Sequence, residues 1–489
     1  MRNQVQLITY VDRLTGGGLD DLKGLLQGPL AGVFGGAHLL PFFHPIDGVD
    51  AGFDPIDHTQ VDPRLGTWKD LQSLGSTVEL MADLIVNHAS SLSTQFQDFS
   101  RHGIDSPYAG MFLTLDRVFP NGATEADLLR IYRPRPGLPF TSVSLENGDK
   151  HLLWTTFTPQ QVDIDVHHPQ GIAYLNAILE RFHEAGVRAI RMDAVGYAIK
   201  KPGTSCFMIP ETFKFINELT SRAHRLGIEV LVEVHSYYKQ QVEIARQVDW
   251  VYDFALPPLV LHALHNSDVR PLERWLSIRP NNSITVLDTH DGIGVIDVGA
   301  DVAGNPGLLK PAEINDLVES IHHLSNGQSE RATGAAANNL DLYQVNCTYL
   351  DALGNNETLY LIARAIQFFV PGIPQVYYVG LLGGRNDTIL LERTGVGRDI
   401  NRHYYTMAEV KESLGRPMVK RLLELIRLRN SHPAFGGRCK VDSTSRSRLS
   451  IAWEIDSHRI ALDVDLLRPR ANIEYSTEEA SQSATMCIE

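Results

Sequence analysis

Cysteine is scarce in this chain, with four among 489 residues. The four lie far apart, without the paired spacing of a zinc site or the density of a disulfide framework, so we expect free thiols. They are Cys206, Cys347, Cys439 and Cys487. The doublets His167-His168 and His322-His323 do not match a metal-binding pair on a helix, and solvated or capping roles suit them better. We therefore predict no metal site.

Long apolar segments are also missing. No uninterrupted apolar run is long enough to span a bilayer, and no apolar signal segment precedes the first predicted strand at Val5. Basic charge is in short supply, because 44 Lys and Arg stand against 58 Asp and Glu, for a net charge of −14. This balance argues against nucleic acid or an anionic membrane as partner. We expect a cytoplasmic enzyme.

Eight apolar segments have the composition of buried strands, and helical patterns lie between several of them. The strands are predicted at residues 5–10, 32–43, 80–86, 187–190, 228–232, 250–258, 284–287 and 373–380, and helices, among others, at 175–185, 213–226 and 311–324. This alternation predicts parallel strands with right-handed crossovers. No glycine motif that could hold a phosphate follows the first strand, which argues against a dinucleotide-binding sheet.

Four of these strands end in polar residues of catalytic type. Arg191 and Asp193 close one strand, Glu233 follows the next, and His88 and Asp291 follow two others. Acids that converge from different strand tips are typical of the C-terminal mouth of a (β/α)8 barrel, so we predict an α/β fold of the TIM-barrel type. Taken alone, Arg191 and Asp193 would equally suit a structural ion pair at a strand end.

A plain barrel needs about 250 residues, so other segments must account for the remainder. We assign residues 1–88, 167–293 and 357–434 to the barrel, 89–166 to an inserted irregular α/β domain after strand 3, 294–356 to a long insertion after strand 7, and 435–489 to a small C-terminal β domain. Within the last, 449–455 and 459–466 predict a hairpin, and 476–489 resembles a polar tail. Long loops after strands usually carry function.

The strand ends also carry a family resemblance. Residues 83–88, 191–194, 233–235 and 288–291 resemble the ordered motifs of the α-amylase superfamily of retaining α-glycosidases and transglucosidases, over most of the chain. Within it, residues 5–10, 47–58, 132–137, 251–258, 341–346 and 397–403 resemble the sucrose phosphorylase family. The resemblance implies reversible, retaining transfer of a glucosyl group from sucrose to inorganic phosphate, giving α-D-glucose 1-phosphate and D-fructose, with no cofactor.

For the three acids, the resemblance implies the roles of a double displacement. Asp193 would be the nucleophile that forms a covalent glucosyl ester, and Glu233 the acid that protonates the leaving fructosyl oxygen and later the base for the acceptor. Asp291 would steady the oxocarbenium-like transition state. Glu233 must then begin protonated near neutral pH, whereas Asp193 beside Arg191 should stay charged.

The resemblance further implies the residues that hold the substrates. Asp50, His88, His290 and Arg398 would bind the glucosyl hydroxyls, and Phe53 and Phe157 would offer apolar surface to the sugar faces. Those assigned to phosphate are Arg135, His235 and Tyr343, and those assigned to fructose are Asp341 and Gln344. The remaining residues expected to bind substrate, without a more specific role, are Gln161, Arg191, Tyr197 and Leu342. Other interpretations stay open: Phe53 and Phe157 suit an ordinary core, Asp50 a turn, and Arg135 a clamp between the inserted domain and the barrel. Loop 334–344 is a candidate moving part, although a rigid loop fits the sequence as well.

Two other function classes remain. A phosphorylase for sucrose 6'-phosphate, glucosylglycerol or glucosylglycerate, or a sucrose-using transglucosidase or hydrolase, would differ mainly at residues 341–344. A catalytically inactive barrel, serving as a binding or transporter-associated subunit, is disfavoured by the intact acid set. Asn87 follows the pattern that helps bind calcium in many amylases, but we find no convincing acidic partner for it in residues 100–166. A homodimer is an arrangement that the sequence leaves open.

Overall fold

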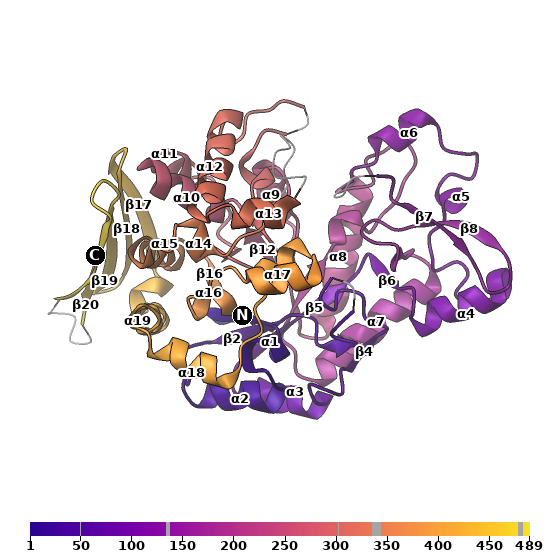
Figure 1. The fold of residues 1–489 in the computed structure, drawn as a ribbon, viewed down its shortest axis with the longest axis horizontal. Coiled ribbons are helices and arrows are strands. Elements are labelled where there is room, and N and C mark those ends of the chain that lie inside the picture. The colour runs from indigo at the N-terminus through magenta and orange to yellow at the C-terminus, as the bar shows by residue number, and fades with distance from the viewer. Residues whose placement is uncertain (49, 134–136, 302, 335–343, 478–482) are drawn as a thin grey trace.

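The computed structural model describes residues 1–48, 50–133, 137–301, 303–334, 344–477 and 483–489. Eight parallel strands close into a barrel at the centre of the molecule (Figure 1). They are β1 Gln6–Thr9, β2 Gly36–Leu39, β5 Glu79–Ile85, β10 Ala189–Asp193, β11 Glu229–Val232, β12 Trp250–Asp253, β13 Ser283–Thr285 and β16 Ile373–Tyr377. Each overlaps a predicted segment, and the predicted (β/α)8 barrel is confirmed.

Helices cover the outside of the barrel because each turns an apolar stripe inward. Helix α7, Pro169–Glu184, begins with proline at its first turn and buries Leu175, Ile178, Leu179 and Phe182, which are spaced for one helix face. The other main helices are α1 Val11–Thr15, α2 Leu19–Gln27, α3 Trp68–Gly75, α8 Pro210–Arg225, α9 Tyr238–Ala245, α10 Leu256–Asn266, α11 Arg270–Leu276, α15 Glu357–Phe369, α16 Tyr378–Leu381, α17 Thr388–Thr394, α18 Met407–Gly415 and α19 Pro417–Ser431.

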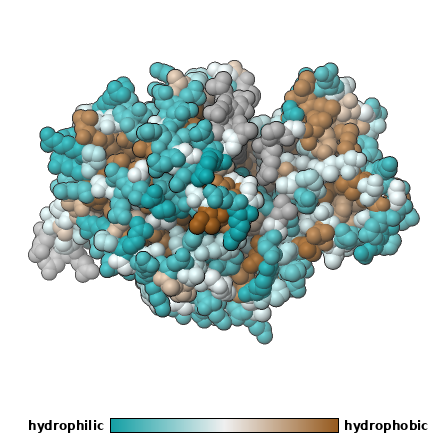
Figure 2. All heavy atoms as spheres, in the orientation of Figure 1, coloured by the Kyte–Doolittle hydropathy of each residue, from teal (hydrophilic) through white to brown (hydrophobic). Residues whose placement is uncertain are grey.

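An irregular lobe follows strand β5 and lies to one side of the barrel (Figure 1). It contains β6 His88–Ser90, α4 Thr94–His102, η1 Gly103–Asp105, α5 Leu115–Val118, α6 Glu125–Arg130, β7 Phe140–Ser144, β8 Lys150–Trp154 and β9 Gln161–Asp163. Strand β6 pairs antiparallel with β9, which ties the lobe to the end of β5. Figure 2 shows hydrophobic atoms on its surface, where Ile104 is 89% and Leu129 68% exposed.

A second insertion separates β13 from β16. It contains β14 Ile293–Gly294, η3 Ile296–Val298, α12 Pro311–Leu324, α13 Gln328–Thr333, β15 Gln344–Val345 and α14 Tyr349–Ala352. Helix α12 confirms the helix predicted there. Strands β14 and β15 pair antiparallel, with Gly294 opposite Gln344, so this small sheet brings both ends of the insertion together.

The C-terminal region is a five-stranded antiparallel sheet, at the left of Figure 1. Its strands are β17 Arg438–Ser445, β18 Arg448–Ile455, β19 His458–Asp465, β20 Arg470–Ser476 and β21 Ser483–Ile488. The predicted hairpin is confirmed as β18 and β19. The predicted polar tail is wrong, because β21 pairs along the length of β20. An edge strand needs few apolar residues, and in β21 only Ile488 is buried.

All four cysteines are free thiols, as predicted, and Cys206 and Cys347 are buried. Within the described part of the chain, every helix is too short or too polar to cross a membrane.

Candidate active site

The three predicted catalytic acids leave the barrel at one end. Asp193 is the last residue of β10, Glu233 directly follows β11, and Asp291 lies between β13 and β14. Met192 is paired with Val232 across β10 and β11, so the acids that follow them emerge at the same level.

These acids line one pocket, whose free space of about 670 Å³ includes part of the solvent at its open mouth. Its wall consists of Asp50, Phe53, His88, Phe157, Gln161, Arg191, Asp193, Ala194, Tyr197, Glu233, His235, His290, Asp291, Gln344 and Arg398. All of these except Ala194 were predicted as site residues, and the structure brings them together, while their individual roles stay predictions. The predicted residues Arg135, Asp341, Leu342 and Tyr343 lie outside the described residues.

Arg191 connects the acids at the bottom of the pocket. Its Nη1 lies 2.6 Å from Oδ1 of Asp83 and 3.1 Å from Oδ1 of Asp193, and its Nη2 lies 3.9 Å from Oε1 of Glu233. Burial alone would raise the pKa of Asp83, but His38 and Arg191 hold that pKa well below its usual range. The ionised Asp83 thus fixes the guanidinium of Arg191, and this guanidinium orients the carboxyl groups of Asp193 and Glu233.

The pKa of Asp193 is subject to opposing influences. Burial raises it well above its ordinary value, and the neighbouring Glu233 acts in the same direction, against the opposing charge of Arg191. The contact with Arg191 at 3.1 Å favours the ionised form, so the charged state that the sequence predicts for Asp193 stays a prediction.

Asp291 has the opposite environment. Arg398 Nη1 lies 2.8 Å and Arg402 Nη2 3.9 Å from its Oδ1, and both arginines also lie 3.6 Å from a carboxylate oxygen of Asp50. Burial acts against ionisation, but Arg398, His290 and Arg402 together hold the pKa of Asp291 well below its usual range. Sequence reasoning did not assign Arg402 to the site, although it belongs to a segment that carried the resemblance.

Aromatic and imidazole rings form a further part of the pocket wall. Phe53 stacks on His290 with ring centroids 5.0 Å apart, and Phe157 meets His88 edge-on at 5.5 Å. Burial lowers the pKa of His290 to about 3, so this ring is neutral at physiological pH. Nε2 of His88 lies 2.9 Å from the carbonyl oxygen of Phe53 and 3.1 Å from Nε2 of Gln161. Nδ1 of His88 is buried and has no hydrogen-bond partner among the described residues.

Two pocket residues adopt a left-handed backbone conformation without being glycine. Asp50 has φ 54° and Ala194 has φ 55°. Such backbone costs on the order of 1–3 kcal/mol and is typical of functional sites. Asp50 therefore occupies the turn expected for it and also lines the pocket. At Ala194 the turn directs the backbone N–H to Oε2 of Glu233 at 3.3 Å. No sequence signal marks an alanine of this kind, which is why Ala194 was missed.

A buried lysine fills the region beside Asn87. Lys200 Nζ lies 2.7 Å from Oδ2 of Asp163 and 2.9 Å from Oδ1 of Asn87, and it also donates to the carbonyl oxygen of Tyr197. Asp163 is thus an acidic residue near Asn87, within residues 100–166, that sequence reasoning did not single out, and its partner is Lys200. Its carboxylate pairs with an ammonium group, so the oxygens around Asn87 already surround a cation from the chain itself.

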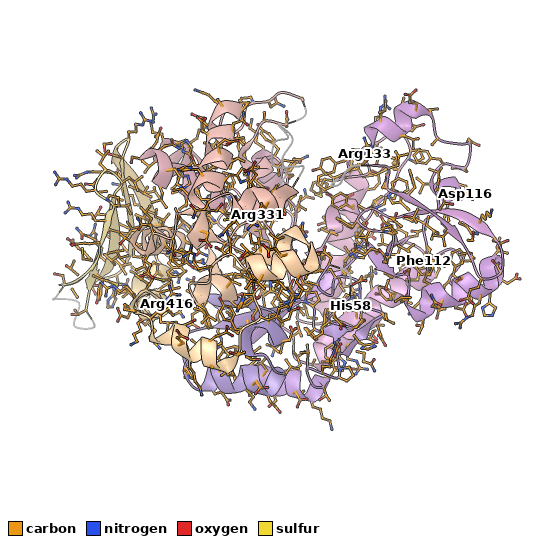
Figure 3. The ribbon with its side chains drawn as sticks, in the orientation of Figure 1. His58, Phe112, Asp116, Arg133, Arg331 and Arg416 are labelled. Atoms are coloured by element: carbon orange, nitrogen blue, oxygen red, sulfur yellow. The ribbon has the colours of Figure 1, made fainter. Side chains whose placement is uncertain are left out.

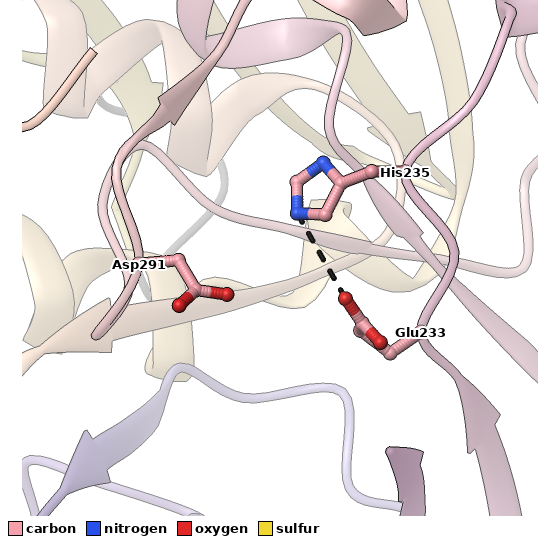
Figure 4. Close-up of side chains that lie close together, drawn as sticks. All are labelled: Glu233, His235 and Asp291. Carbon is pink, nitrogen blue, oxygen red and sulfur yellow. Dashed lines mark ion pairs between the residues drawn. The ribbon is translucent and has the colours of Figure 1, made fainter. Parts of the chain in front are cut away.

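Figure 4 shows a further cluster, in which Glu233, His235 and Asp291 place donor atoms within 4.8 Å of one another. Such a set could hold a metal ion. Here Asp291 faces Arg398 and Glu233 faces Arg191, so each carboxylate already has a cationic neighbour. The arrangement suits proton transfer and sugar binding better than a second cation.

Comparison with known proteins agrees with this geometry. The family model for the α-amylase catalytic domain matches residues 32–252. A sucrose phosphorylase of Agrobacterium vitis is 62% identical to this chain, and the match covers 97% of this chain and 98% of the relative. The chain belongs to the sucrose phosphorylase family. A second sucrose phosphorylase, from Bifidobacterium adolescentis, is 54% identical over 94% of the chain and 92% of its own length.

The fold extends to other phosphorylases of the family. The crystal structure of a sucrose 6F-phosphate phosphorylase from Thermoanaerobacter thermosaccharolyticum matches with a TM-score of 0.92 and 38% identity, over 99% of this chain and 98% of the other. The family predicted from the sequence is confirmed. As a member of the sucrose phosphorylase family, the chain is a glycosyl-transferring enzyme, and an inactive barrel is disfavoured.

Proposed function

We propose that the chain is a sucrose phosphorylase, which transfers the glucosyl group of sucrose reversibly to inorganic phosphate with retention, giving α-D-glucose 1-phosphate and D-fructose. The observation that carries this proposal is the convergence of Asp193, Glu233 and Asp291 on one pocket, where Arg191 lies between the first two. A nucleophile, an acid–base group and a fixed carboxylate are what a retaining displacement requires.

In the first step, a carboxylate oxygen of Asp193 forms a bond to the anomeric carbon while the bond to the fructosyl oxygen breaks. Glu233 gives its proton to that oxygen, and fructose leaves. The reaction needs a proton on Glu233 and a negative charge on Asp193. Arg191 supports this distribution because its Nη1 lies 3.1 Å from Asp193, whereas its Nη2 lies 3.9 Å from Glu233. Sugar bound in the pocket would displace water from around Asp193 and Glu233.

In the second step, a phosphate oxygen attacks the same carbon, the ester bond to Asp193 breaks, and the proton of the phosphate hydroxyl returns to Glu233. Two inversions give net retention. Asp291 stays ionised beside Arg398 and offsets the positive charge of the transition state. Asp50 and Arg398 would hold glucosyl hydroxyls, because paired polar groups reject a misoriented ring.

Phosphate, rather than water, must be the preferred acceptor. We propose that Arg135 and Tyr343 bind it together with His235, and that Asp341, Leu342 and Gln344 contact fructose when the direction reverses. His235 and Gln344 line the described pocket and support this assignment. The 62% and 54% identity to two sucrose phosphorylases, against 38% to the sucrose 6F-phosphate enzyme, favours sucrose as donor. A cytoplasmic location, supported by four free thiols, and a homodimer are further proposals.

The test is to incubate the purified protein with sucrose and varied phosphate, without added cofactor, and to quantify all products. We expect fructose and glucose 1-phosphate in equal amounts, at a rate that saturates with phosphate. Release of free glucose at a rate independent of phosphate would identify a hydrolase. Turnover of glucosylglycerol, glucosylglycerate or sucrose 6'-phosphate in preference to sucrose would identify one of the related phosphorylases.

A further inference from the structure

His235 lies next to Glu233, the proposed acid–base residue. It follows Glu233 by two positions beyond strand β11, and its ring stacks on Phe254 with centroids 3.7 Å apart. The residue is 4% exposed. Its Nε2 lies 3.9 Å from Oε1 of Glu233, and Figure 4 shows this nitrogen on the side of the ring that faces Glu233 and Asp291.

The other ring nitrogen is held by a carboxylate from a different segment. Nδ1 of His235 lies 2.9 Å from Oδ2 of Asp297, which belongs to η3 in the insertion after β13. Asp297 is fully buried, and its second oxygen accepts from Ser236 N at 3.1 Å and from Gln241 Nε2 at 2.7 Å. With both oxygens occupied, this carboxylate has one orientation.

The backbone at Gly294 leaves room for the contact. A Cβ atom at this position would lie 2.5 Å from Oδ2 of Asp297 and 3.2 Å from Nδ1 of His235. Any side chain would separate the carboxylate from the ring. Opposite Gly294, Gln344 is paired on β15, and its Nε2 lies 3.4 Å from Nε2 of His235 while its Oε1 accepts from Arg398 at 3.3 Å. The insertion thus contacts both nitrogens of His235. The Gln344 amide can donate only to a neutral His235, so it must release Nε2 when the ring is protonated and phosphate accepts from Nε2–H.

We propose that Asp297 is a positioning residue for the acceptor step: by holding Nδ1–H of His235, it presents Nε2–H of an imidazolium to the anionic phosphate that enters beside Glu233. This inference rests on the proposed phosphorolysis and adds a residue to it. A neutral sugar acceptor needs only a hydrogen bond from His235 Nε2, whereas the anionic phosphate is bound more tightly when that donor carries a positive charge. Asp297 therefore favours the anion over water and sugar.

The charges around the His235 ring also favour its protonated form. Burial lowers the pKa of His235, but Asp297, followed by Glu233 and Asp291, raises it above its ordinary value. Gln344 and Phe254 are neutral, and Arg398 contacts Gln344. Burial, followed by the charge of Asp297, raises the pKa of Tyr132. Phosphate binding should be strongest while His235 is protonated and should weaken as pH rises through the pKa of His235. Without the charge of Asp297, that weakening begins at lower pH.

Two substitutions separate charge from geometry. Asp297→Asn removes the charge and keeps an oxygen acceptor for Nδ1–H, with its amide nitrogen in place of the oxygen that accepts from Ser236 and Gln241, whereas Asp297→Ala removes the charge and both acceptors. Asp249→Asn is the matched control, because Asp249 Oδ2 also accepts from a histidine, His224 Nε2 at 2.7 Å, and from Val230 N at 2.9 Å, but at the opposite end of β11. Each variant is assayed between pH 5.5 and 8.5, a window of about one to two units around an unperturbed histidine pKa.

For Asp297→Asn we expect the KM for phosphate at neutral pH to rise about ten- to hundredfold, the usual range for losing a charge-assisted hydrogen bond. The burst of fructose from sucrose, which reports formation of the glucosyl-enzyme, should change less than about threefold. Relative to the wild type at each pH, which cancels the ionisation of phosphate itself, the loss should grow as pH rises. Asp249→Asn should keep the wild-type KM for phosphate.

An unchanged KM for phosphate and an unchanged pH profile in Asp297→Asn would overturn the inference. So would an equal loss of the fructose burst and of phosphate use, because that would make Asp297 a support of the whole site. Gly294→Ala gives an independent check and should raise the KM for phosphate in the same way. If the wild type itself does not use phosphate, the proposed function fails, and this result is distinct from a failure confined to the variants.

Discussion

Arg398 Nη1 lies 2.8 Å from Oδ1 of Asp291, a contact that joins the loop after β13 to η5, Gly397–Asn401, beyond the last barrel strand. The same guanidinium lies 3.6 Å from Asp50. One arginine thus fixes the carboxylate assigned to transition-state stabilisation and a residue assigned to the sugar hydroxyls.

Arg398→Met should lower kcat/KM for sucrose about a hundredfold, the usual effect of removing one electrostatic partner from a preorganised site. The pKa of Asp291 is depressed in the wild type, so its loss of ionisation occurs far on the acid side. Without Arg398 that pKa rises, and activity should fall at a higher pH on the acid limb than in the wild type. A pH–rate profile measures both effects. An acid limb identical to the wild type would contradict this role for Arg398.

The catalytic acids give a sharper pair of expectations. Asp193→Ala should abolish turnover, because no other group can form the covalent ester, whereas Glu233→Gln should slow it by about two to four orders of magnitude. Both variants should retain the far-ultraviolet circular dichroism spectrum and melting temperature of a folded barrel. Near-normal turnover of sucrose by Glu233→Gln would mean that Glu233 is not the acid.

Lys200 provides a prediction on stability and on metals. Lys200→Met leaves Asp163 buried without its counter-ion, which should cost about 3–5 kcal/mol, as removal of one partner of a buried pair does. The adjacent Lys201→Met is the control, because Lys201 pairs with Glu211 at the surface, with side chains 52% and 38% exposed, and such pairs contribute little. Chemical denaturation should separate the two variants, and a chelator should leave wild-type activity unchanged. Equal stability of both variants would rule out this role for Lys200.

Arg135 lies outside the described residues, so its role is predicted from the sequence. Arg135→Ala should chiefly raise the KM for phosphate, about ten- to hundredfold for a lost contact of roughly 1.5 to 3 kcal/mol, while hydrolysis and transfer to sugars survive. Arg133→Ala is the neighbouring control, since Arg133 is exposed on the inserted lobe (Figure 3) and donates to Gly137 O at 3.1 Å. A parallel loss of both activities and of thermal stability would instead make Arg135 a clamp between lobe and barrel.

The barrel could be predicted because its strands are buried on both sides and appear as contiguous apolar runs. The pocket residues could be predicted because catalytic groups follow the strand ends in order along the chain. Strand β21 was missed for the same physical reason, since an edge strand has one exposed side and resembles a polar tail.

Residues that act through distant partners could not be found in this way. Asp297 lies 62 positions from His235, and Lys200 lies 113 positions from Asn87, so neither pairing leaves a local pattern. The positive φ of Ala194 is equally invisible, because alanine is not a residue that signals such a turn. The raised pKa of Asp193 also follows from burial, which composition and spacing do not reveal.

The most direct test of the account is the anomeric configuration of the first product. Wild-type protein is mixed with sucrose and phosphate, and proton and phosphorus NMR spectra are recorded before the reverse reaction becomes significant. Double displacement through Asp193 predicts that the initial glucose 1-phosphate is the α anomer and that fructose accumulates at the same rate. Initial formation of the β anomer would contradict the covalent mechanism, and with it the roles assigned to Asp193 and Glu233.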